Sequence, residues 1–235
     1  MLMVTLRLLL AGALVLPMLS ACAVNGDPRD PLEPMNRAIY RFNEKVDDVA
    51  LEPLAKGYVA VTPKPVRSAV RNFFSNLDDV VVFANNALQL KGRAATSDFL
   101  RVVFNSTLGF AGLLDIASEM GLPKHDEDFG QTLGHWGVTS GPYFVMPLLG
   151  PSTIRDSAGW LVDGVYLDPA YQLDDTGARN ATAAVRVVSH RAELLDAKRA
   201  IDIAALDPYE FSRDLYFEHR AAKLRDGRPA PPADD

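Results

Sequence analysis

Cysteine is almost absent from this sequence: among 235 residues, only position 22 carries one. No disulfide can form within one such chain, so the fold must be held together by packing and hydrogen bonds. Basic runs are missing too, since 24 Lys and Arg face 30 Asp and Glu, a formal net charge of −6. This acidic surplus argues against nucleic acid as a partner and excludes adhesion to anionic lipid by charge alone.

Motifs of the common catalytic and nucleotide sites are also lacking. The sequence has no G-x-S-x-G, H-E-x-x-H, P-loop or G-x-G-x-x-G pattern, and its four histidines are scattered without ligand spacing. The acidic segment 125–128 fails as a calcium loop because position 137, where a carboxylate is needed, is glycine. We therefore predict no catalytic residue, no metal and no cofactor. We interpret 125–128 as a solvated acidic turn and His135 as a side chain that satisfies a buried hydrogen bond.

The N-terminus contains one short hydrophobic run, residues 8–19. It fits the core of a secretory signal and is too short to cross a bilayer, which takes about 20 helical residues. Small residues then lead into Cys22 in a sequence, LSAC, that resembles a bacterial lipobox. The resemblance implies a signal peptide over 1–21, acylation of Cys22 and a lipidated tether over 22–30. Ala23 stands where aspartate would resemble an inner-membrane retention signal, so we expect sorting to the outer membrane.

The body of the chain has the apolar spacing of helices. Steps of three and four residues begin at Met35, and Pro63 and Pro65 open a second helix that we expect Gly92 to end. We expect a third helix to begin near Thr96 or Ser97, either of which is a suitable N-cap.

Two C-terminal helices are expected over 185–198 and 209–224, and only 143–146 has strand character. No repeat or linker divides the body. We predict one all-α domain over 31–224, with a glycine-rich loop or short hairpin, and a disordered proline-rich tail over 225–235.

The segment 98–116 inverts the usual pattern of a surface helix. Polar or small residues recur at steps of three and four, and nearly everything between them is Phe, Leu, Val or Ala. The polar stripe comprises Asp98, Arg101, Asn105, Gly109, Gly112 and Asp115. Such a helix is either buried in a core or immersed in lipid, and the predicted lipid anchor favours immersion, with the stripe lining a lipid path.

A glycine-dense segment follows at 129–150, with aromatic residues between its glycines. Glycine permits positive φ, and a long loop inside a compact domain is more often functional than filler. We predict a mobile lid or rim that contains Gly130, Gly134, Gly137, Gly141, Pro142 and Tyr143. The alternative is a passive connector.

Seven motifs occur in the order typical of the MlaA/VacJ family of outer-membrane lipoproteins. They are 30–37 (DPLEPMNR) with 40–43, 66–67 with 72–77, 105–109 with 112 and 115, 128–134 with 137, 141–143, 147–156 in part, and 207–209. The sequence resembles this family over roughly residues 30–224. It departs only in its short proline-rich tail.

The resemblance implies a ring-shaped helical domain that is embedded in one leaflet of the outer membrane, on the periplasmic side. It further implies an amphipathic channel that removes phospholipids from the outer leaflet, with Phe42 and Asn43 on the lipid path. The implied partners are phospholipids, a periplasmic lipid-carrier protein and a trimeric porin. A purely structural porin-binding lipoprotein and a lipid-anchored lipid or glycan hydrolase are the alternatives.

Overall fold

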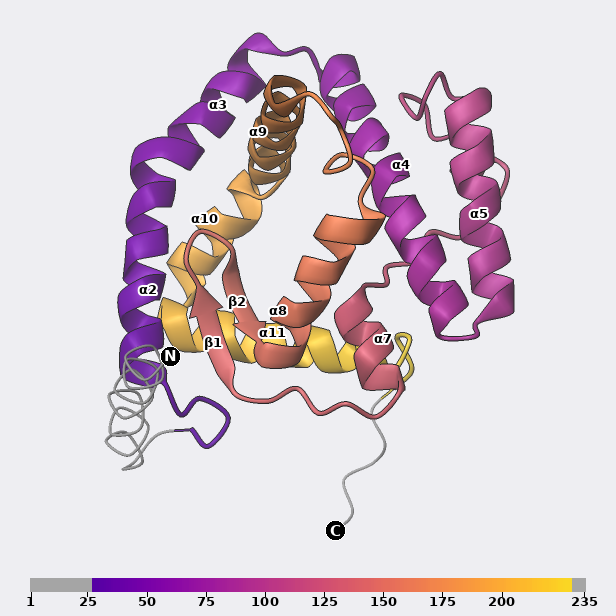
Figure 1. The fold of residues 1–235 in the computed structure, drawn as a ribbon. Coiled ribbons are helices and arrows are strands. Elements are labelled where there is room, and N and C mark those ends of the chain that lie inside the picture. The colour runs from indigo at the N-terminus through magenta and orange to yellow at the C-terminus, as the bar shows by residue number, and fades with distance from the viewer. Residues whose placement is uncertain (1–26, 230–235) are drawn as a thin grey trace, which may run out of the picture.

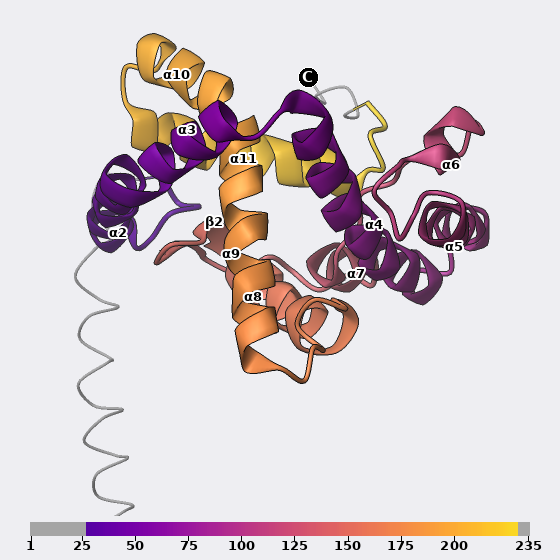
Figure 2. The ribbon, with the colours of Figure 1, turned by 90° about the horizontal axis from the view of Figure 1, so that it is seen from above.

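The computed structural model describes residues 27–229, and the structural statements below concern that part of the chain. It is a mainly helical domain in which α2, α3 and α4 arch around α8, α9 and a short hairpin, and α11 crosses the base of the arch (Figure 1). Seen from above, α9 runs through the middle of the molecule (Figure 2). The predicted helical domain with a short hairpin is confirmed.

The elements, in chain order, are α2 (Glu33–Val46), η1 (Asp47–Leu51), α3 (Glu52–Val61), α4 (Lys64–Leu88), α5 (Gly92–Thr107), α6 (Ile116–Glu119), α7 (Phe129–His135), β1 (Tyr143–Met146), β2 (Gly150–Thr153), α8 (Ile154–Val162), η2 (Asp163–Leu167), α9 (Thr176–Glu193), α10 (Leu195–Ala204) and α11 (Pro208–Leu224).

The first arm of the arch is a continuous helical rod formed by α2, η1 and α3. Pro53 lies near the start of α3, and a proline inside an α-helix removes a backbone donor and clashes with the preceding turn. The π-helical turn η1, just before Pro53, gives a wider turn in which both problems are relieved.

The ends of the predicted domain differ from expectation. Asp30, predicted to lie in the tether, is 2% exposed and accepts hydrogen bonds from Asn36 Nδ2 (2.7 Å) and the Tyr209 hydroxyl. At the other end, Asp226 of the predicted tail pairs with Lys91. The signal peptide, Cys22, most of the tether and residues 230–235 lie outside the described residues.

Helix boundaries around α5 also differ from expectation. Gly92 does not end the preceding helix: α4 stops at Leu88, and Leu90 turns the chain with φ of 60°. The predicted N-caps are wrong, since α5 begins at Gly92 and the Thr96 hydroxyl donates to the Gly92 carbonyl inside the helix. The expected helix over 185–198 is divided in two at Leu194, where α9 gives way to α10.

The inverted segment 98–116 is not one helix. Its first part is the C-terminal portion of α5, which ends at Thr107, and a turn with positive φ at Phe110, Ala111 and Gly112 leads to the short α6. Phe110 and Ala111 have no sequence signature of such a turn, because non-glycine residues rarely adopt this conformation.

The hairpin confirms the predicted extended segment 143–146. Strands β1 and β2 are antiparallel, with Tyr143 opposite Thr153 and Met146 opposite Gly150. The other edge of β1 is covered by Asn36 and Asn43, seven residues apart on α2. Val145 N donates to Asn36 Oδ1 (2.9 Å), and Asn43 Nδ2 donates to the Met146 carbonyl (2.9 Å). Two asparagines thus satisfy an edge that would otherwise be unpaired.

The predicted long glycine loop is largely structured. Gly130 and Gly134 belong to α7, which packs closely on α8, and a Cβ added at Gly159 of α8 would lie 2.2 Å from Gly130 N. A Cβ added at Gly134 would lie 2.5 Å from the Leu224 side chain. These glycines allow helices to approach closely, so the prediction that they form a mobile lid is wrong.

Polarity is inverted in the described part of the chain. Nine hydrophobic residues are buried, compared with 22 polar or charged ones, and 33 large hydrophobic residues are exposed. Water-soluble domains bury their apolar residues and seldom bury Asp or Arg. Over residues 27–229, none of the helices has both the length and the apolar character needed to traverse a membrane.

Candidate functional site

The main cavity, of about 670 Å³, lies between α4, the loop before α7, η2 and α9. A second cavity of about 310 Å³ adjoins it along α4 and α9, because both are lined by Ser75, Asp78, Arg186 and His190. Helices α4 and α9 therefore line both cavities.

Part of the cavity lining is charged. Arg186 on α9 pairs with Asp78 on α4 and with Asp168 after η2, and its guanidinium lies 5.6 Å from the centre of the Phe74 ring. Burial opposes the charged form of Arg186, but the two carboxylates outweigh it and raise the pKa above the usual value. Arg186 thus stays ionised at the point where the elements meet.

Asp163, the first residue of the π-helical turn η2, faces the same cavity without a cationic partner among the described residues. Its carboxylate accepts hydrogen bonds from Asn85 Nδ2 (2.9 Å) and from Phe129 N (2.8 Å). Burial raises its pKa to about 6, although these two donors favour the ionised form. Asp163 therefore changes charge near neutral pH.

Other parts of the lining are apolar. They comprise Val81 and Val82 on α4, Leu149 at the hairpin tip, Trp160 on α8, Tyr171 and Val187, while residues 124–128 before α7 add further polar and charged side chains. A cavity that offers both charged and apolar contacts matches a ligand that has a polar head and apolar tails, because neither part loses suitable contacts on entry.

The polar stripe lies elsewhere and is sealed. Asp98, Arg101 and Asn105 are at most 3% exposed and face inward, between α4, α5 and α6. Arg101 donates to Asp79 Oδ2 (3.2 Å), to Asp115 Oδ1 (3.1 Å) and to the Leu122 carbonyl (2.9 Å). The prediction that these side chains line an open lipid path is wrong: they hold helices together, as in the core alternative.

Asp115 completes this network. Partial burial opposes its ionisation, but hydrogen bonds from Ser118 and Asn105 and the charge of Arg101 lower its pKa to about 2. The glycines of the stripe are packing positions as well. A Cβ at Gly112, where φ is 89°, would lie 2.7 Å from that of Asn76, and one at Gly109 would lie 2.2 Å from the Leu114 carbonyl oxygen.

The apolar residues of the same segment lie on the outer surface of the domain. Phe99, Leu108, Phe110, Leu113 and Leu114 are between 42% and 72% exposed. The inverted pattern was therefore recognised correctly, but the polar stripe is the inward face and the apolar face is the outer surface.

Asn43 borders the hairpin, and Phe42 precedes it on α2. Phe42 is 52% exposed, whereas Asn43 binds both the end of β1 and the hairpin turn, since its Oδ1 also accepts from Leu148 N (2.7 Å). Asn43 and Leu149 line a further cavity of about 320 Å³ between η1, the hairpin and α10, and Leu149 also lines the main cavity. Asn43 thus positions a hairpin tip that reaches both cavities.

The predicted rim is only partly exposed. Gly137 and Gly141 have φ of 87° and 70°, and Pro142 beside them is exposed. Tyr143 is 1% exposed and belongs to a core cluster with Val145 and Tyr209, so its assignment to a rim is wrong.

The histidine and acidic residues of 125–128 form more contacts than a solvated turn would. His125 Nδ1 lies 2.7 Å from Asp98 Oδ1, and Glu127 is 8% exposed and bound to Gln89 and Lys91. Conversely, His135 is exposed, which contradicts the predicted buried hydrogen bond.

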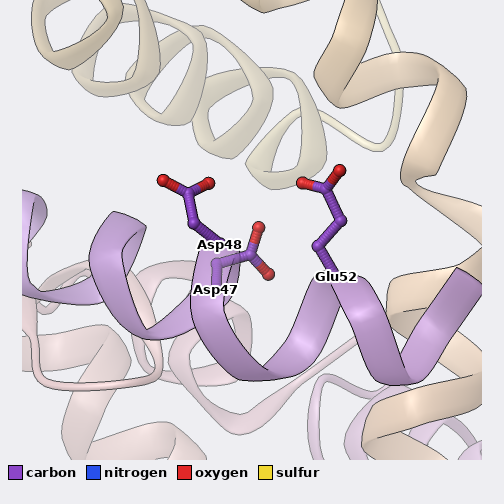
Figure 3. Close-up of side chains that lie close together, drawn as sticks. All are labelled: Asp47, Asp48 and Glu52. Atoms are coloured by element: carbon purple, nitrogen blue, oxygen red, sulfur yellow. The ribbon is translucent and has the colours of Figure 1, made fainter.

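One carboxylate cluster has the spacing of a metal site. Asp47, Asp48 and Glu52 place ligand atoms within 4.8 Å of one another on the rod (Figure 3). Two of them are already neutralised: Arg191 Nε lies 2.6 Å from Asp47, and Lys56 Nζ lies 2.5 Å from Glu52. The cluster fastens the rod to α9.

No sequence motif marks the cavity residues. Asp78, Asp163 and Arg186 are far apart in the chain and belong to no motif that carries chemistry. Only the fold brings them together.

A helical domain with an ion-paired interior, an apolar surface and a cavity lined by both charged and apolar side chains is of the class that handles amphipathic molecules at membranes. A model of the family described as MlaA lipoprotein matches residues 28–223. The chain belongs to this family, which confirms the resemblance seen in the motifs.

Two relatives bear the name intermembrane phospholipid transport system lipoprotein MlaA. The Escherichia coli K12 protein is 34% identical over 217 residues, which span 88% of this chain and 85% of that protein. The Haemophilus influenzae protein is 33% identical over 219 residues, 89% of this chain and 87% of its own length.

A solved structure described as the structural basis for maintenance of bacterial outer membrane lipid asymmetry has the same fold. It superposes with a TM-score of 0.73 at 32% identity and covers 83% of this chain and 98% of that one.

Proposed function

We propose that this protein removes phospholipids from the outer leaflet of the outer membrane and passes them through its cavity to a periplasmic carrier. The observation that carries the proposal is the inverted polarity of the domain around a cavity lined by both charged and apolar side chains. The names of the relatives in Escherichia coli and Haemophilus influenzae support phospholipid as the cargo.

The exposed apolar side chains would lie among the acyl chains of one leaflet, and the domain would be embedded without crossing the bilayer. Phe42 and the hairpin tip would lie on the lipid path, with 137–142 as an exposed rim. A lipid head group would pass Arg186 and Asp163, while its acyl tails would contact Trp160, Val187 and the other apolar residues of the lining. Removing a head group from water without such partners costs several kcal/mol.

Three acyl chains on Cys22, as the lipobox resemblance implies, would anchor the protein durably, because a single chain gives only marginal binding. We propose that the anchor holds it on the periplasmic side of the outer membrane, next to a trimeric porin. We further propose that it performs no chemistry on the lipid.

The test is a count of phospholipids in the outer leaflet of cells with and without this protein. Loss of the protein should raise the count, and re-expression should restore it. Arg186→Gln, which removes a charge from the cavity lining, should fail to restore the normal count at a normal protein level. The matched variant Arg93→Gln, on the exposed surface of α5, should restore it fully. An unchanged count in cells that lack the protein would contradict the proposal.

Lipid recovered with the purified protein separates the alternative functions. A transporter should carry intact phospholipid, a hydrolase should yield lysolipid or free fatty acid, and a purely structural lipoprotein should carry no lipid.

A further inference from the structure

A separate basic pocket lies where α3 turns into α4, beside the end of α9. The turn between α3 and α4 is at the top of the arch in Figure 1. It has a volume of about 240 Å³ and is lined by Tyr58, Lys64, Arg67, Ser68, Arg71, Ser189, Ala192 and Glu193. Three cations and a single carboxylate therefore surround one small cavity.

Lys64 and Arg71 are exposed and Arg67 is half-buried, and all three differ from the interior cations in lacking an ion-pair partner among the described residues. Arg101, Arg186 and Arg191 each pair with at least two carboxylates. Among the described residues, no carboxylate oxygen lies within 4 Å of the charged nitrogens of Lys64, Arg67 or Arg71. Glu193 shares their pocket without pairing with any of them.

Two donors in this pocket also lack an acceptor. Arg67 Nε and the Tyr58 hydroxyl are buried, and neither finds a hydrogen-bond partner in the described part of the chain. A buried donor without a partner is costly, so native structures rarely keep one that is not satisfied by water or a ligand. Two such donors beside three cations that no described carboxylate neutralises favour an acceptor with several negative oxygens.

We propose that this pocket binds the phosphate group of a phospholipid. A phosphodiester offers two charged oxygens, and the planar guanidinium of Arg67 can bind them through parallel N–H groups, with Lys64 and Arg71 adding charge. Val61 and Val66, 80% and 49% exposed, come from the same corner and would accompany the acyl chains.

The pocket adjoins the transport cavity through shared lining residues. It shares Arg71, Ser189 and Glu193 with the second cavity, which in turn shares Arg186 with the main one. A head group bound here would therefore stand at one end of the path, as a holding site before entry or after exit. This assignment rests on the proposed function for the identity of the lipid.

The experiment measures binding to the purified full-length mature protein by ³¹P NMR. Three probes are compared: dihexanoyl phosphatidylglycerol, inorganic phosphate, and dihexanoylglycerol as a competitor without phosphate. The test variant is Arg67→Gln with Arg71→Gln, and the matched control is Arg41→Gln with Arg93→Gln, two exposed arginines outside the pocket. Tyr58→Phe removes only one donor and keeps the shape of the pocket.

Phosphatidylglycerol should bind the wild type and the control alike and should be displaced by phosphate but not by dihexanoylglycerol. Its affinity should fall at least about tenfold in the double variant and a few-fold in Tyr58→Phe, because charge-assisted hydrogen bonds are lost. If the double variant does not fold, unchanged affinity in Tyr58→Phe overturns the proposal.

Other results also overturn it. Equal affinity in wild type and the double variant would exclude the pocket as a phosphate site. Binding of inorganic phosphate that phosphatidylglycerol cannot displace would mean a site for free anions. The experiment measures binding and not transport. The proposed transport function can therefore be disproved while the phosphate site is confirmed, and the phosphate site can be disproved while the transport function is confirmed.

Discussion

Asp78 and Asp79 are neighbours on α4, yet they belong to opposite regions of the molecule. Asp79 is fully buried against α5 and is held by Arg101 and Lys124. The side chain of Asp78 is 51% exposed, opens into the cavity and pairs with Arg186. The two faces of α4 therefore use similar charges differently.

The sealed face stabilises the fold, because a buried charge that is left without its partner is costly. The open face keeps charge accessible to a ligand. Under the proposed function, access to the cavity, and not residue type, decides which of these charges meets a ligand.

The largest effect on stability is expected at Arg101. Arg101→Met leaves Asp79 and Asp115 without their shared partner, so the free energy of unfolding should fall by about 3–5 kcal/mol. Asp78→Asn, on the open face, should cost about 1 kcal/mol or less, because the Asp78 side chain is half in water and Arg186 keeps its pair with Asp168. Thermal denaturation of both variants measures the contrast, and equal losses would show that the two faces do not differ.

Two glycines test the same difference between a packed surface and an open one. Gly112→Leu must place a side chain at φ of 89° and against Asn76, so it should lower stability by about 1–3 kcal/mol. Gly57→Leu, on α3 with open space around it, should instead stabilise the helix by about 0.5–1 kcal/mol. A stable Gly112→Leu protein that has lost lipid removal would restore the channel-lining role for this glycine.

The smallest effect on stability is expected at Asp163, and this effect depends on pH. Its pKa is raised in the folded state, so its stabilising contribution is complete below its usual pKa near 4 and is lost as pH rises through about 6. Asp163→Asn cannot ionise, so its melting temperature relative to wild type should increase between pH 5 and pH 7.5. A difference that stays constant over this range would show that Asp163 titrates normally.

Much of the fold could be predicted from the sequence, because helical spacing survives even when polarity is inverted. The starts of α2 and α4 and nearly all of α11 follow from apolar periodicity and proline placement. Helix α7 was hidden by its glycines, which normally argue against a helix but here allow contact with α8.

The functional site was harder to predict. The stripe from Asp98 to Asp115 had the correct pattern, but periodicity cannot distinguish a lipid path from a sealed polar interior. The cavity residues Asp78, Asp163 and Arg186 meet only through tertiary packing, so no local pattern identifies them.

The central claim is that the exposed apolar face lies in lipid. The most direct test is nitroxide labelling of single-cysteine variants in membranes, with accessibility to oxygen and to a water-soluble nickel complex measured at each site. Phe110 and Val61 should give labels accessible to oxygen and protected from nickel, while exposed Arg93 and Asp196 should give the reverse. The parent chain, with Cys22 alone, supplies the background. Labels at Phe110 and Val61 as accessible to nickel as those at Arg93 and Asp196 would contradict the account.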